Sequence, residues 1–170
     1  MSNVIPRPTP AHPGCAWGPA FDRLALPGTL GAPAELRTWA VRCLASCRRP
    51  YATSSDLAES LKLVASELAT NAVTHSASGE DGGFLVAAIH FPHDCAALWV
   101  FDLGPRPGAP SAPQAPPRLL DALDLFDTEH GRGLALIALH SRRYGWTAPP
   151  DHPAHSVWAE LSAYPVAVAA

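Results

Sequence analysis

The stretch from Ser55 to His75 constrains the fold of this chain more than any other part of its sequence. Apolar residues recur in it at three- and four-residue spacing, which predicts a long helix with one buried face. At about 100° per residue, Glu67, Asn71 and His75 fall at or beside that apolar face. Polar groups buried there need hydrogen-bond partners. The pattern therefore predicts either a polar ligand against this face or a polar rim where the helix end leaves the core.

The segments around this helix predict an α/β domain. Further helices are expected over 34–47 and from 132 to about 142, and strands over 17–26, 84–91, 96–101 and 156–161. Proline-rich stretches without periodicity flank or interrupt these segments. We expect a disordered lead-in at 1–16, one domain over 17–164 with a flexible lid at 105–130, and a short tail at 165–170.

The composition limits the class of protein. Hydrophobic residues make up 48% of the 170 residues, which is enough to build a core. The formal charge of -3 provides no positive field for phosphate backbones, so no direct nucleic-acid binding is expected. No apolar run reaches the ~18 residues that span a bilayer, and the first residues lack the features of a signal peptide. We expect a cytoplasmic protein without a membrane anchor.

The four cysteines, Cys15, Cys43, Cys47 and Cys95, contain no C-x-x-C pair. A reducing compartment would keep them as thiols, and we interpret them as packing residues. The alternative is a metal site, at Cys43 and Cys47 or at the cluster of His90, His93 and Cys95. Neither group offers four ligands at a recognisable spacing.

A second functional signal is Asp102-Leu103-Gly104, directly after a predicted strand. A carboxylate at a strand end can accept a hydrogen bond from the amino group of a flat heterocycle, and a glycine lets a ligand approach the backbone. Taken alone, such a tripeptide is more often a simple turn.

A third signal is Gly131-Arg132-Gly133-Leu134 at the start of the last predicted helix. Free backbone N–H groups and the helix dipole favour phosphate oxygens there. Glycine before a helix is often only a joint, so the motif is weak by itself. The order of the three signals, with a long loop between the last two, favours a nucleotide site.

Together, the three segments resemble the ATP-binding domain shared by DNA gyrase, a heat-shock chaperone, histidine kinases and MutL. The string Ser-Glu-Leu-x-x-Asn-Ala-x-x-His, from Ser66 to His75, is similar to that of the anti-sigma-factor serine/threonine kinases. The resemblance implies the Bergerat-type fold, a two-layer α/β sandwich in which a mixed β-sheet carries α-helices on one face.

The resemblance also implies a role for each matching residue, with ATP and Mg²⁺ as cofactors. Glu67 would be the general base, and Asn71 would coordinate Mg²⁺. Asp102 would receive the adenine amino group, with Gly104 beside it. The phosphates would lie against the backbone of Gly131, Arg132, Gly133 and Leu134. His75 is expected to contact the lid or the phosphates, or else to satisfy its own surroundings at the helix end.

The chain departs from the family pattern at Ala154-His155 and at Pro105, which follows Asp102-Leu103-Gly104 where histidine kinases have a second glycine. Ala154-His155 replaces a Gly-Lys or Gly-Thr pair before the last strand, which puts phosphate contacts there in doubt. Lys62, the only lysine, lies on the outer side of its helix, so positive charge near the phosphates must come from Mg²⁺ and from Arg132, Arg106 or Arg118.

The resemblance further implies a regulatory kinase that transfers the ATP γ-phosphate to a serine of an anti-anti-sigma-like protein. A sigma factor is the second expected partner, and a homodimer is left open. The alternative from another class is a binding module that uses ATP to recruit a partner without efficient transfer.

Overall fold

The computed structural model describes residues 21–106, 132–147 and 155–163. The predicted lead-in and tail and nearly all of the predicted lid lie outside these ranges. The elements follow one another as β1 (Asp22–Pro27), α1 (Ala32–Ser46), the 3-10 helix η1 (Pro50–Thr53), α2 (Ser55–His75), the 3-10 turn η2 (Ala77–Gly79), β2 (Phe84–His90), β3 (Cys95–Asp102), α4 (Arg132–His140), β4 (Arg143–Thr147) and β5 (His155–Ser162).

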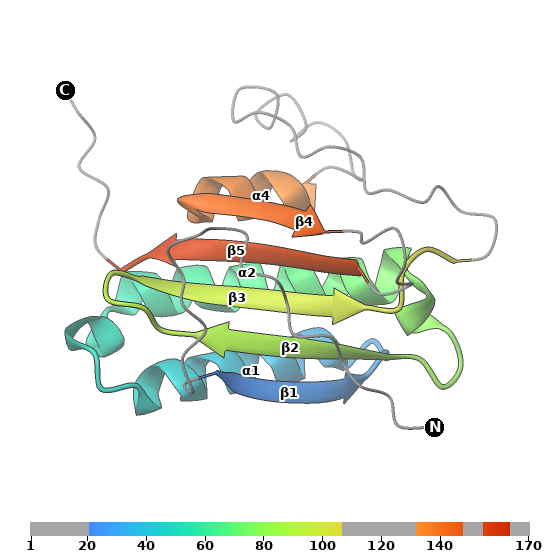
Figure 1. The fold of residues 1–170 in the computed structure, drawn as a ribbon, viewed down its shortest axis with the longest axis horizontal. Helices are drawn as coiled ribbons and strands as arrows, with labels where there is room; N and C mark the ends of the chain where they lie inside the picture. The colour runs from blue at the N-terminus through green and yellow to red at the C-terminus, as the bar shows by residue number, and fades with distance from the viewer. Residues whose placement is uncertain (1–20, 107–131, 148–154, 164–170) are drawn as a thin grey trace.

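The five strands form one sheet in the order β1-β2-β3-β5-β4, with the helices on one face (Figure 1). The predicted two-layer α/β fold is confirmed. The expected mixed sheet is not found, because all four strand pairs among the described residues are antiparallel. β3 and β4 do run in the same direction, as strands joined through a helix should. However, β5 lies between them, so no parallel ladder forms.

The core lies between the sheet and α2. Leu61, Val64 and Leu68 lie on the apolar face of α2 and are fully buried. They pack against the inner side chains of the strands, such as Leu98 and Leu161. Each such side chain contributes about 1.5–3 kcal/mol when it leaves water. This burial fixes how α2 is rotated, and therefore where its polar side chains lie.

The ends of α2 agree with the sequence prediction. Ser54 is the N-cap, and its Oγ accepts a hydrogen bond of 3.3 Å from the backbone N–H of Leu57. This satisfies one of the free N–H groups of the first turn. At the other end, the backbone becomes extended at Ser76.

The predictions near the C-terminus need two corrections. The last helix ends at His140 rather than near 142, and Arg143–Thr147 form a strand, β4, that the prediction missed. β4 pairs with β5 at the edge of the sheet, which places α4 as the connection across β5. The strand expected over 17–26 is found as β1 from Asp22 to Pro27, and residues 17–20 lie outside the described ranges.

The cysteines of the described residues act as packing groups. Cys43 and Cys95 are buried, and Cys47 is half-buried. Burial raises the pKa of Cys43 to about 11.

In the described part of the chain, no three His, Cys, Asp or Glu side chains gather where they could hold a metal ion. Within the same ranges, no helix is long and apolar enough to cross a membrane.

Candidate functional site

The first turn of α4 lies against the middle of α2. A Cβ atom placed on Gly133 would lie 2.6 Å from Oε2 of Glu67 and 3.7 Å from Oδ1 of Asn71. The absence of a side chain at Gly133 therefore leaves room for both polar groups. The structure therefore brings together Glu67, Asn71 and Gly133, which the sequence predicted for one site. The first two belong to α2 and the third to α4.

Glu67 lies at the edge of the buried face of α2 and is half-buried. Desolvation by the surrounding protein raises the pKa of its carboxyl group above the ordinary value. A carboxylate with a raised pKa is a stronger base than an exposed one. The position of Glu67 therefore suits proton transfer better than a surface ion pair.

Asp102 ends β3 and is only 9% exposed. Its Oδ1 accepts a hydrogen bond of 2.7 Å from the backbone N–H of Gly104, whose positive φ of 81° suits glycine. Burial raises the pKa of the Asp102 carboxyl, while the Gly104 N–H, His155 and Ser76 act in the opposite direction. His155 is the residue opposite Asp102 on β5.

The turn after α2 holds the end of β3 in place. Ser76 Oγ donates to the carbonyl of Ala72 at 2.7 Å and accepts from the N–H of Ser78 at 3.0 Å. Ser78 is fully buried, and its Oγ accepts from the N–H of Leu103 at 3.0 Å. The N–H of Ala77 donates to the carbonyl of Gly104 at 2.8 Å. The Asp102–Gly104 segment is therefore fixed to the C-terminal end of α2.

Sequence reasoning missed this supporting turn. Its signal is the Ser-Ala-Ser sequence directly after the helix, since serine hydroxyls often bond to nearby backbone groups at such ends.

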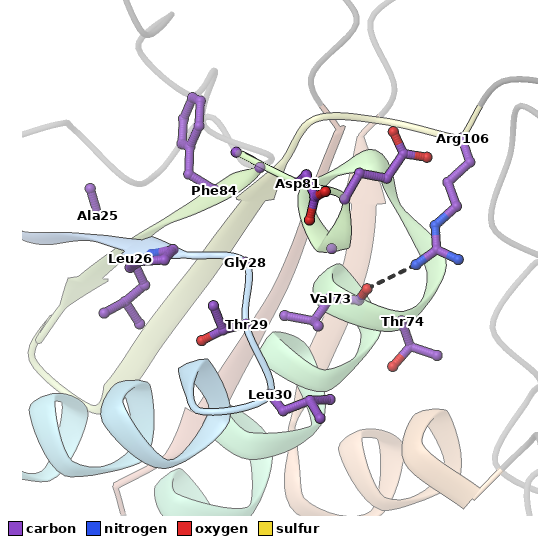
Figure 2. Close-up of a pocket in the computed structure, with 15 residues that line it drawn as sticks. Ala25, Leu26, Gly28, Thr29, Leu30, Val73, Thr74, Asp81, Phe84 and Arg106 are labelled. Atoms are coloured by element: carbon purple, nitrogen blue, oxygen red, sulfur yellow. Dashed lines mark hydrogen bonds between the residues drawn. The ribbon is translucent and has the colours of Figure 1, made fainter.

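Arg106 follows the Asp102–Gly104 segment and closes the end of α2. Its Nε donates to the carbonyl of Ser76 at 3.2 Å. One of its terminal nitrogens donates to the carbonyl of Val73, also at 3.2 Å (Figure 2). These carbonyls have no partner within the last turn of a helix. The guanidinium of Arg106 therefore caps the end of α2, and the expectation that it supplies positive charge to phosphates stays a prediction.

The comparison with known families decides the class. The family model of the histidine kinase-like ATPase domain matches residues 30–148. The chain belongs to this ATPase family. The match runs from the turn before α1 to the residue after β4, and so includes α2, the end of β3 and the start of α4. A comparison with curated proteins gave no significant match.

The remaining residues predicted for the nucleotide site lie in different surroundings. His75 is exposed at the last position of α2, and its expected contact with the lid or the phosphates stays a prediction, because the lid lies outside the described residues. Leu134 is half-buried and packs against the core. The backbone of Arg132 begins α4. Gly131 lies outside the described residues.

A cavity of about 930 Å³ lies elsewhere in the ATPase domain (Figure 2). It lies between the turn after β1, the loop before β2 and the C-terminal end of α2, with Leu30, Val73 and Phe84 in its wall. Arg106, which was expected near the phosphates, lines this cavity, whereas Glu67, Asn71 and Asp102 do not. The assignment of the nucleotide site to α2, β3 and α4 rests on the chemistry of these residues and stays a prediction.

The residues present fit the cofactors that the family implies. Members of the family bind ATP, typically with Mg²⁺. The space that a Cβ would fill at Gly133 adjoins one carboxylate and one amide oxygen. Such hard oxygen atoms are the ligands that Mg²⁺ prefers. The N-terminus of α4, which borders the same space, favours phosphate groups.

Proposed function

We propose that this ATPase domain is a regulatory serine/threonine protein kinase of the anti-sigma-factor type. Its substrate would be a serine of a small anti-anti-sigma-like protein, and a sigma factor would be the protein it regulates. The observation that carries the proposal is the place of the Glu67 carboxylate, half-buried beside Gly133 in the first turn of α4. A general base is needed at that point if the γ-phosphate lies at the helix N-terminus.

In this proposal, the residues divide into binding and chemical roles. Asp102 accepts a hydrogen bond from the adenine amino group, and the Gly104 N–H orients its carboxylate. The backbone at Gly133 and Leu134 binds phosphate oxygens. Asn71 would hold Mg²⁺ through its side-chain oxygen. When bound, the ion would neutralise charge on the phosphates.

The transfer step assigns one proton to Glu67. The hydroxyl oxygen of the partner's serine attacks the γ-phosphorus while the bond from that phosphorus to the bridging oxygen breaks. ADP leaves with the electron pair of that bond, and the hydroxyl proton passes to the Glu67 carboxylate. Burial supports this role because it raises the pKa of Glu67.

A second candidate function is an ATP-dependent binding module without efficient transfer. The observation that favours it is the use of two basic residues elsewhere. Arg106 bonds to the end of α2, and Lys62 forms an ion pair of 2.6 Å with Glu59. Both cations are engaged in these contacts, and cationic groups near the transferring phosphate are important for that step.

The two functions are separated by a transfer assay. Wild-type protein and Glu67→Gln would be incubated with Mg-ATP labelled on the γ-phosphate and with candidate anti-anti-sigma-like proteins. The kinase proposal expects label on a serine with the wild type and a loss of about 10²–10⁴ in rate with the variant. Nucleotide-dependent partner binding without label transfer would favour the binding module instead.

A further inference from the structure

The face of the sheet opposite the helices carries an aromatic cluster. We call the "outer face" the surface formed by Phe21, Ala88, Ala97, Trp99, Phe101 and Trp158. Phe21 lies against the ring of His90, with 4.6 Å between ring centroids, and against Trp99 at 5.9 Å. An antiparallel sheet that faces water on one side normally carries polar residues there. The apolar residues of the outer face therefore indicate that another part of a protein covers it.

The cluster continues across the far edge of the sheet. Trp158 on β5 is directly opposite Gly145 on β4. A Cβ atom on Gly145 would lie 2.8 Å from Cζ2 of the Trp158 indole. The ring therefore lies flat over the backbone of β4, which extends the aromatic surface from the start of β1 to the opposite edge.

The centre of the outer face is buried although the described helices lie on the other side of the sheet (Figure 1), whereas Phe21, Phe101 and Trp158 are half-buried. Trp99 is 7% exposed, Ala88 3% and Ala97 1%. These exposures hold for a single copy of the chain, so a second copy is not needed to account for them.

Residues 1–20 have the position and the chemistry needed to cover the outer face. Phe21, the first described residue, already lies on the outer face, and twenty residues precede it. Five of those twenty are prolines, and Trp17 is among them. Proline lacks the N–H that an added strand needs, but polyproline-II segments bind well to surfaces lined by aromatic rings.

Residues 1–20 are also long enough to cross the outer face. In the polyproline-II form, twenty residues span about 60 Å at ~3.1 Å per residue. A five-stranded sheet is only about 19 Å wide at ~4.8 Å between neighbouring strands. The segment can therefore cross the whole outer face.

We propose that residues 1–20 bind to the outer face of the sheet as an intramolecular proline-rich ligand, with Trp17 and the prolines against Trp99, Phe101 and Trp158. This interaction goes beyond the proposed kinase function and does not depend on it. It predicts that the N-terminal segment is part of the folded domain.

Hydrogen exchange of the full-length protein, read by mass spectrometry, tests the proposal. Amides of residues 1–20 should exchange at least about tenfold more slowly in the wild type than in Trp158→Ala. Trp17→Ala should accelerate their exchange similarly, and it leaves the sheet untouched if Trp158→Ala fails to fold. Leu30→Ala, at a 93% exposed position on another surface, is the matched control and should not change them.

Two results would overturn the proposal. One is exchange of residues 1–20 at the rate of an unstructured peptide in the wild type, with no change in Trp17→Ala. The other is a wild-type dimer, measured by light scattering, that becomes monomeric in Trp158→Ala. The outer face would then be an interface between copies of the chain.

Discussion

Gly133 and Glu67 approach each other so closely that a single added carbon on the glycine would lie 2.6 Å from Oε2 of the glutamate. The two residues belong to helices that are far apart in the sequence. Their approach brings the N–H groups at the start of α4 to the one carboxylate on this part of α2 whose pKa is raised by burial. The candidate site depends on this contact.

Replacing Gly133 with alanine should therefore damage function more than stability. The Glu67 side chain can rotate away from the new methyl group, and alanine favours a helix over glycine by about 1 kcal/mol. We expect an unchanged or slightly higher melting temperature and at least a tenfold loss of phosphoryl transfer. Gly31→Ala is the matched control, because its Cβ would meet only side-chain atoms at 3.6 and 3.7 Å. Equal activity in both variants would contradict the assigned contact.

Asp102→Asn should raise the stability of the ligand-free domain at neutral pH. Burial raises the folded-state pKa of Asp102, so folding favours its protonated form. The stabilisation from this group is present below its unfolded pKa, about 3.9, and is lost as the pH rises through the folded pKa. The amide has no charge to desolvate, and it can still accept the Gly104 N–H. Urea unfolding at pH 4 and pH 7 checks this: a variant less stable than the wild type at pH 7 would contradict it.

Variants of Glu67 and Asn71 should have different effects, one on phosphoryl transfer and the other on nucleotide binding. Glu67→Gln should keep the affinity for Mg-ATP within a few-fold, because the side chain acts on the attacking hydroxyl. Asn71→Ala should weaken binding only when Mg²⁺ is present, because it removes a metal ligand. Calorimetry with and without Mg²⁺ measures both effects. If Glu67→Gln abolishes binding or unfolds the domain, Glu67 has a structural role.

Ser78→Ala should loosen the end of β3. The variant leaves the buried N–H of Leu103 without its acceptor, at a cost of about 1–3 kcal/mol in the free energy of unfolding. Because Leu103 follows Asp102, nucleotide affinity should fall as well. Ser46→Ala is a control, since its exposed hydroxyl only donates to the carbonyl of Arg42. Denaturant titration of both variants checks the difference, and equal loss of stability in the two would argue against the supporting turn.

Much of this fold could be predicted because its signals are local. The bounds of α2 follow from its apolar spacing and from the capping serine, Ser54. The contact of Glu67 and Asn71 with the start of α4 followed from the family resemblance of three motifs. Helix periodicity alone placed the polar residues on the correct face, but it could not show what lies opposite them.

The errors concern features that tertiary structure decides. A helical wheel puts His75 beside the apolar face, but the residue is exposed, because the wheel does not show which positions neighbouring elements cover. β4 contains a glycine and is only partly buried, so it lacks the regular alternation of a typical strand. The antiparallel sheet results from the insertion of β5 between β3 and β4, which no local pattern reveals.

Calorimetric titration of Mg-ATP into the wild type, Asp102→Asn and Leu30→Ala tests the central claim most directly, because it distinguishes the site at α2, β3 and α4 from the cavity at Leu30. The account predicts that the wild type and Leu30→Ala bind equally well. Asp102→Asn should lose on the order of 1.5–3 kcal/mol, which is a ten- to hundredfold loss of affinity. Unchanged affinity in Asp102→Asn, or loss of binding in Leu30→Ala, would contradict the assignment.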